Sequence, residues 1–244
     1  MCYGDEARPP APPVQGEVGD HGDLLLTSAD GTEFSAYHAR PAGAVSRGIV
    51  ILPDVRGLHQ FYKDLALRFA EAGLHAIAID YFGRSAGIGP REEDFPFREH
   101  VDKTQPETIA ADVAAAVAWL RAQPGIGPIF TVGFCFGGSN SWAQSAAGHG
   151  LAGCMGFYGM PSRVENLVPR MSAPLLLLAA GADFTPPETV AEFADRVRAA
   201  GVPATMTVFD GMPHSFFDRT YAEHGEACER AWREMLSFME AHGG

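Results

Sequence analysis

The sequence is poor in cysteine, in basic residues and in long apolar runs, and each shortage excludes a class of protein. Its 244 residues include four cysteines. They form no Cys-x-x-Cys pair, which argues against a zinc knuckle, a thioredoxin-like motif and a disulfide framework. Lysine and arginine number 18 against 30 aspartates and glutamates, for a formal net charge of -12. So acidic a chain, without a basic run, is not expected to bind nucleic acid or an anionic membrane.

No apolar stretch approaches the roughly 18 residues that a membrane-spanning helix needs. The longest lies around residues 174–180. The N-terminal residues also lack the apolar core of a secretory signal, so we expect a cytoplasmic protein. No group of His, Asp and Glu has the spacing of zinc ligands, and we expect no metal and no cofactor. The expected partner is a small molecule, bound by a monomer or a homodimer.

The order of predicted elements indicates one α/β domain. Residues 1–15 are Pro-rich and polar, and we expect a flexible arm there, followed by a single domain over residues 16–244. An Asp-Gly turn at 30–31 predicts an antiparallel hairpin formed by residues 24–27 and 32–38. Short apolar runs predict buried parallel strands at 48–52, 75–80, 129–132, 153–157, 175–179 and 205–209. Helical spacing predicts helices at 62–71, 107–122, 138–147, 187–200 and 221–241.

Strand–helix alternation of this kind predicts a mostly parallel central sheet with helices on both faces and the hairpin at its N-terminal side. The least regular segment, residues 82–105, follows a strand end, where open α/β sheets bind ligands. Two interpretations of it stay open: a solvated connection, or a lid or wall of a pocket.

The segment Gly133-Phe-Cys135-Phe-Gly137 has the form Gly-x-nucleophile-x-Gly, with cysteine where serine is usual. A predicted strand runs into it and a predicted helix leaves it, which is the context that this motif requires. The turn would expose the thiol at the carboxyl edge of the sheet, and the helix N-terminus would favour the thiolate. It would also direct the Phe136 N–H toward a bound carbonyl. The alternative is a buried structural cysteine in a glycine-rich turn.

Candidate partners for the thiol follow two later strands. Asp183 comes after the strand at 175–179, and His214 after the strand at 205–209. Both therefore belong to the same sheet edge as Cys135, in the chain order nucleophile, acid, histidine that this motif uses. His214 would act as the base and Asp183 would orient it. Taken alone, Asp183 could be a turn or helix-capping residue and His214 a loop histidine. Of the other histidines, His59 is the one expected near the mouth of the site.

The loop after the first parallel strand, Pro53-Asp54-Val55-Arg56-Gly57-Leu58, is the other candidate part of the site. The Val55 N–H is a candidate second donor to the oxyanion. Asp54 and Arg56, at the carboxyl end of a strand, suggest a functional role. The alternative is a surface turn with its own ion pair.

These segments, with Ala-Gly-Ala-Asp at 180–183 and Pro-His-Ser-Phe at 213–216, resemble the dienelactone hydrolase (carboxymethylenebutenolidase) family of α/β-hydrolases. The resemblance runs from the hairpin to the last helix and implies an α/β-hydrolase fold. It also implies that Cys135, His214 and Asp183 form the catalytic triad. Asp54 matches an acidic residue, usually Glu, that helps to generate the thiolate.

The resemblance further implies a set of substrate-binding residues. Arg84 matches an arginine that binds the substrate carboxylate, and Tyr158 matches an aromatic residue of the pocket. The family enzyme that opens dienelactone has a second such arginine four positions after the histidine. This chain has Asp218 there, followed by Arg219. Arg56 and Arg219 are therefore additional candidates for binding an anionic substrate.

The main hypothesis is hydrolysis of a small ester or lactone, of the dienelactone type, through a cysteine thioester. One alternative is a broader carboxylesterase or acyl-transfer enzyme acting on small neutral esters. The other is a binding protein with this fold and no catalysis. A complete triad argues against the last.

Overall fold

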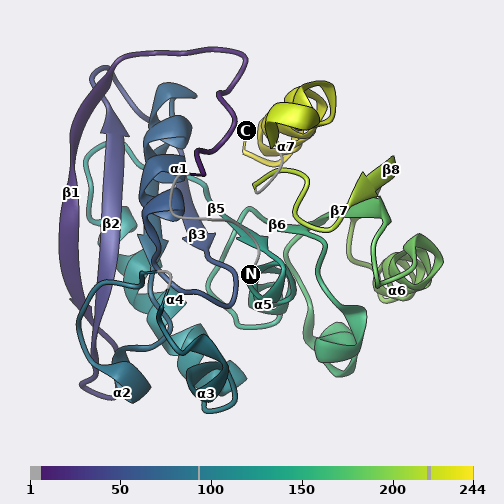
Figure 1. Ribbon diagram of the computed structural model, residues 1–244, viewed down its shortest axis with the longest axis horizontal. Helices are drawn as coiled ribbons and strands as arrows, with labels where there is room; N and C mark the ends of the chain where they lie inside the picture. Colours follow the sequence, from purple (N-terminus) through teal and green to yellow (C-terminus); the bar gives the residue numbers. More distant parts are fainter. Residues whose placement is uncertain (1–6, 93, 219–220, 244) are drawn as a thin grey trace.

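The computed structural model describes residues 7–92, 94–218 and 221–243, whose strands form one twisted sheet (Figure 1). The strand order is β1-β2-β4-β3-β5-β6-β7-β8. β1 pairs antiparallel with β2, and β2 antiparallel with β4, while the remaining neighbours are parallel. The bounds are β1 Val18–Thr27, β2 Glu33–Pro41, β3 Gly48–Leu52, β4 His75–Ile79, β5 Ile129–Phe134, β6 Gly153–Phe157, β7 Leu175–Ala182 and β8 Ala204–Pro213.

Helices cover both faces of this sheet. The α-helices are α1 Gln60–Glu71, α2 Gly83–Ala86, α3 Phe97–Val101, α4 Pro106–Arg121, α5 Phe136–Gln144, α6 Pro187–Ala199 and α7 Gly225–His242. The 3-10 helices of the described residues are η1 Pro161–Arg163, η2 Glu165–Arg170 and η3 Tyr221–Glu223. None of the helices described here is both long and apolar enough to cross a membrane.

Alternate residues of each central strand belong to two separate cores. Ile49 and Ile51 of β3 pack in the same cluster as apolar side chains of α1 and α7. Val50 and Leu52 pack in the other cluster, with apolar side chains of α4, α5 and α6. Successive side chains of β3 thus point to opposite faces of the sheet, and all of them are buried, as expected of a sheet that is covered by helices on both faces. The predicted fold class is therefore confirmed.

The bounds of the helices and strands differ from the predicted ones where the pattern of apolar residues does not mark the end of an element. β1 and β2 extend beyond the predicted hairpin strands, and α7 begins at Gly225 rather than at 221. The short helices α2, α3, η1 and η2 were not predicted, because such short helices depend on tertiary contacts rather than on their own periodicity.

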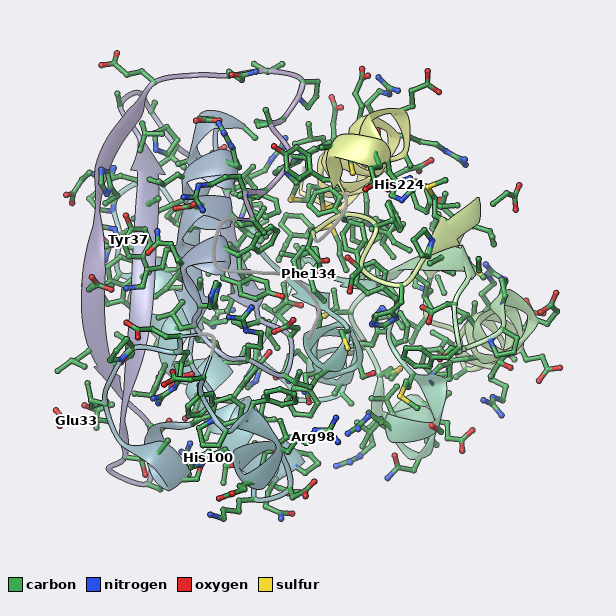
Figure 2. All side chains as sticks on the ribbon, viewed as in Figure 1. Glu33, Tyr37, Arg98, His100, Phe134 and His224 are labelled. Atoms are coloured by element: carbon green, nitrogen blue, oxygen red, sulfur yellow. The ribbon has the colours of Figure 1, made fainter. Side chains whose placement is uncertain are left out.

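Part of the irregular segment over 82–105 is anchored to the body of the protein. Phe82 is fully buried, and Arg91 is 5% exposed with its guanidinium 2.8 Å from the Asp80 carboxylate. His100, at the lower edge of Figure 2, stacks on Phe95 with ring centroids 5.0 Å apart. These contacts fix the segment beside the carboxyl end of β4, and its role as a lid or pocket wall stays a prediction.

The described part of the N-terminal arm forms no helix or strand, but it packs against the body of the protein. Pro9 and Pro10 are buried. The indole of Trp232 in α7 donates a hydrogen bond to the Pro10 carbonyl at 3.0 Å. The division into an arm of residues 1–15 and a domain of 16–244 stays a prediction.

Two buried histidines, His38 on β2 and His75 on β4, lie together against Trp119 of α4. Their facing nitrogens are 3.5 Å apart, and the indole lies 5.2 Å and 5.3 Å from the two rings. Burial, and then the neighbouring His38 and Arg40, lower the pKa of His75 from 6.5 to about 4. Charging this pair therefore opposes the folded state.

We expect stability to decrease as the pH falls from 6.5 toward about 4, because there the unfolded chain binds a proton at His75 and the folded protein does not. Between pH 7 and pH 5 this group accounts for up to about 2 kcal/mol of the unfolding free energy. In urea unfolding at both pH values, His75→Gln should lose less stability than the wild type by that amount. An unaltered pH dependence in His75→Gln would contradict the prediction.

Candidate active site

Cys135 occupies the sharp turn between β5 and α5, in a backbone conformation that non-glycine residues rarely adopt. Its φ is 55° and its ψ is -112°, and it is the N-cap of α5. The turn is held by the Cys135 N–H, which donates to the Phe157 carbonyl at 3.1 Å. Strained residues of this kind are concentrated at functional sites, where the surrounding structure holds them in place.

Phe134, the last residue of β5, anchors the turn from inside the protein. Its ring lies near the centre of Figure 2 and stacks on Phe157 and Phe217, with centroids 4.9 Å and 5.7 Å away. Phe134 is fully buried, and its packing holds the end of β5 in place. Cys135, the next residue, lies just beyond this end of the strand. Cys135 is accordingly half-buried.

The glycines of the motif are required because the backbone approaches itself closely here. A Cβ on Gly133 would lie 1.9 Å from the Gly137 carbonyl oxygen. One on Gly137 would lie 2.1 Å from the carbonyl oxygen of Leu52, the last residue of β3, and 2.2 Å from that of Pro53 in the loop that follows. None of these backbone atoms can move aside as a flexible side chain would, so the two glycines allow the turn and the neighbouring loop to lie in contact.

The other described cysteines lie in different surroundings. Cys154 and Cys228 are buried, and burial raises the pKa of each thiol to about 12, helped at Cys228 by the Asp218 carboxylate. Both stay protonated at neutral pH and are poor nucleophiles. Cys2 lies outside the described residues.

Asp183 and His214 are joined by a hydrogen bond between the ends of two paired strands. β7 and β8 are in register at Ala182 and Pro213, the residues immediately before them. Nδ1 of His214 lies 2.9 Å from both carboxylate oxygens of Asp183. The Asp183 side chain is 2% exposed and the His214 side chain 18%. The buried carboxylate thus holds the imidazole through Nδ1.

Among the described residues, the rings of Tyr158 and Phe184 lie close to the imidazole of His214. Tyr158, after β6, lies 4.8 Å from it, and Phe184 lies 4.5 Å from it at an angle of 33°. Tyr158 is buried, whereas Phe184 is 65% exposed. Tyr158 also directly follows Phe157, whose carbonyl holds the Cys135 turn. The loops after β5, β6, β7 and β8 therefore meet at one edge of the sheet.

The loop after β3 contributes Asp54, which is fully buried. Its carboxylate accepts a hydrogen bond from the Arg56 N–H at 2.9 Å, and its own N–H donates to the Tyr62 hydroxyl. The Tyr81 hydroxyl donates to the Pro53 carbonyl at 2.8 Å. Burial raises the pKa of Tyr81 well above its usual value, and negative charge on Asp54, Asp80 and Cys135 raises it further. Tyr81 thus lies within electrostatic reach of both Asp54 and Cys135.

Val55 and Phe136, the predicted oxyanion donors, follow Asp54 and Cys135 directly. Within the described ranges, neither backbone N–H donates a hydrogen bond to a protein acceptor. Phe136 is the first residue of α5, where the N–H groups have no partner within the helix. The two donors, one in the loop after β3 and one at the start of α5, are suited to a developing negative charge.

The predicted anion-binding residue Arg84 is already bound by carboxylates of this chain. Its Nε lies 2.9 Å from Asp30, and its Nη1 lies 2.7 Å from both oxygens of Asp112. Ser28 donates a further hydrogen bond to Asp112. Asp112 is almost fully buried, so Arg84 links α2, α4 and the β1–β2 turn.

We expect Arg84→Ala to destabilise the fold, because it leaves the buried Asp112 carboxylate without its cation. Removing one partner of a buried pair costs about 3 kcal/mol or more, which urea unfolding would measure. Asp112→Ala combined with Arg84→Ala should recover part of the loss, since no buried charge remains. Wild-type stability in Arg84→Ala would show that the pairing has no structural role.

The remaining predicted binding residues lie in different places. Arg56 is 2% exposed within the loop after β3, and Tyr158 lies beside His214. Arg219 lies outside the described residues, while Asp218 before it is fully buried. His59 caps α1, its ring accepting a hydrogen bond from the Phe61 N–H at 3.2 Å.

Phe184 and Tyr81 lie at the site but were not among the residues predicted for it from the sequence. The signal for Phe184 was its position directly after Asp183, as an aromatic residue in a loop of small residues and prolines. No cluster of His, Cys, Asp and Glu suited to a metal ion occurs among the residues that the structure describes.

The eight-stranded sheet and the strained turn at the end of β5 define the α/β-hydrolase class. The sequence pattern of the dienelactone hydrolase family matches residues 34–243. The chain therefore belongs to the dienelactone hydrolase family and is a hydrolase.

Individual relatives agree with this assignment. The protein named "Putative carboxymethylenebutenolidase" of Escherichia coli K12 is 26% identical over 233 residues, covering 88% of this chain and 85% of its own. The Pseudomonas putida carboxymethylenebutenolidase is 28% identical over 171 residues, covering 67% of this chain and 72% of its own. A crystal structure named "Putative Dienelactone Hydrolase", from Klebsiella pneumoniae, has a TM-score of 0.75 at 26% identity, covering 91% of this chain and 99% of its own.

Proposed function

We propose that this protein hydrolyses a small ester or lactone through a thioester on Cys135, with His214 and Asp183 completing the triad. The observation that carries the proposal is the hydrogen bond between His214 and the buried Asp183, on loops at the same edge as the strained Cys135 turn. A carboxylate that fixes the histidine tautomer beside a nucleophile turn is the arrangement that acyl transfer needs.

In the first half-reaction, the Cys135 thiol gives its proton to Nε2 of His214, and the thiolate sulfur bonds to the carbonyl carbon. The Val55 and Phe136 N–H groups hold the resulting oxyanion. As the carbonyl re-forms, the bond to the leaving oxygen breaks and that oxygen takes the proton from His214. The products are an alcohol, or the opened end of a lactone, and a thioester on Cys135.

In the second half-reaction, water attacks the thioester while His214 takes its proton. As the carbon–sulfur bond breaks, the acid is released and the proton on His214 passes to the sulfur, which restores the Cys135 thiol and the neutral histidine. Asp183 stabilises the imidazolium in both halves without exchanging a proton itself. Asp54, which like Cys135 lies within electrostatic reach of Tyr81, is the proposed activator of the thiol.

Two classes of substrate are candidates. A dienelactone-type substrate carries a carboxylate, for which Arg84, Arg56 and Arg219 are the proposed partners and Tyr158 an aromatic wall. A small neutral ester is the second candidate, favoured because Asp30 and Asp112 already occupy two of the three nitrogens of Arg84. Relative rates on a carboxylate-bearing enol lactone and on a neutral ester of similar size separate the two.

The experiment that tests the reaction is hydrolysis of an activated aryl ester by the wild type and by Cys135→Ala. Hydrolysis should be lost in the variant while the fold is retained. The cytoplasmic location and the monomeric or homodimeric state stay predictions.

A further inference from the structure

We propose that Phe184 contacts the leaving group of the substrate and selects flat, uncharged leaving groups such as phenols. The inference rests on the proposed function, because it uses His214 as the acid that protonates the leaving group.

Phe184 is held in place by its backbone rather than by its side chain. It directly follows Asp183, and its N–H donates to the Asp183 carboxylate at 2.7 Å. The same carboxylate holds Nδ1 of His214 at 2.9 Å. The loop that orients the histidine thus also fixes the position of the phenylalanine, through a hydrogen bond that does not involve the Phe184 side chain.

The ring of Phe184 lies beside the imidazole with most of its surface free. The two centroids are 4.5 Å apart, and the residue is 65% exposed. Tyr158, on the same imidazole at 4.8 Å, is buried and offers little free surface. Of these two flanking rings, Phe184 is therefore the one that an incoming molecule can cover.

The chemistry places the leaving group within reach of this ring. Since Asp183 occupies Nδ1, the leaving oxygen must take its proton from Nε2, at a separation of about 3 Å. Because the imidazole and Phe184 ring centroids are 4.5 Å apart, a substituent on that oxygen can reach the Phe184 ring. A flat apolar substituent can stack there, at centroid separations of about 4.5–7 Å, whereas a small alkyl group covers little of the ring.

The test compares phenyl acetate with methyl acetate, which share an acyl group and differ in the leaving group. In Phe184→Ala, kcat/KM for phenyl acetate should fall by about 3- to 10-fold, the range expected for loss of one aromatic contact. For methyl acetate it should change less than about twofold. Phe184→Tyr keeps the ring and should keep the preference for phenyl acetate. Leu25→Ala is the control for loss of an exposed apolar residue elsewhere and should resemble the wild type.

Hydrolysis of the acetyl-enzyme distinguishes leaving-group binding from a structural effect on His214. The leaving group has departed by then, so the rate of this step should be unchanged in Phe184→Ala. Equal losses on both esters together with slower hydrolysis of the acetyl-enzyme would overturn the inference, because they indicate a displaced histidine. Unchanged selectivity would overturn it too. If hydrolysis still disappears in Cys135→Ala, either result leaves the proposed function standing.

Discussion

Replacing Cys135 by alanine should reduce kcat/KM for an activated aryl ester by at least about 10³-fold, with the fold intact. The thioester cannot form without the sulfur, and what remains is the modest effect of binding and of the oxyanion donors. The substitution should not unfold the protein, because Cys135 is half-buried and the turn is held by backbone hydrogen bonds. Initial rates, with circular dichroism to verify folding, measure both parts.

The matched controls are the two other described cysteines. Cys154→Ala and Cys228→Ala should keep activity close to that of the wild type, because both thiols are buried with pKa values raised to about 12. Hydrolysis that persists in a folded Cys135→Ala variant would rule out the thioester and direct the search to another nucleophile.

Gly137→Ala should lose about 3 kcal/mol or more of stability together with activity. The added methyl would lie 2.1 Å from the Leu52 carbonyl oxygen and 2.2 Å from that of Pro53. Both are backbone atoms, so relief requires the loop that carries Asp54 and Val55 to move away from Cys135. The substitution therefore separates the two proposed halves of the oxyanion site even in molecules that stay folded.

Urea unfolding and ester hydrolysis of Gly137→Ala test this expectation directly. Gly22→Ala is the control, because a Cβ on Gly22 of β1 has no heavy atom within 4 Å. It should change stability by less than about 0.5 kcal/mol and leave activity unaltered. Wild-type stability in Gly137→Ala would mean that the turn and the loop can separate at little cost.

The sheet could be predicted from the sequence because its central strands are short and buried on both faces. The strands at 48–52 and 75–79 are buried from end to end, and apart from His75 their residues are apolar or glycine, the composition expected of parallel strands covered on both faces. The turn that carries Cys135 could also be predicted. A cysteine flanked by glycines, between a predicted strand and a predicted helix, is typical of the sharp strand-to-helix turn of this fold.

The contacts between side chains that are far apart in the sequence could not be predicted. Arg84 has the sequence context of a substrate ligand, but its partners Asp30 and Asp112 are 54 and 28 residues away. No local pattern relates these positions. Phe184 was missed for a similar reason, because its contact with His214 depends on the pairing of β7 with β8.

The hydrogen bond from Trp232 to Pro10 has a consequence for biosynthesis. These residues are 222 positions apart, so the ribosome produces the proline long before its partner exists. Trp232 is fully buried and packs on Phe69 of α1 with ring centroids 4.7 Å apart. While the chain is growing, that surface of α1 lacks its cover, and nascent protein exposes apolar area that chaperones recognise. Completion of α7 is the step that ends this exposure.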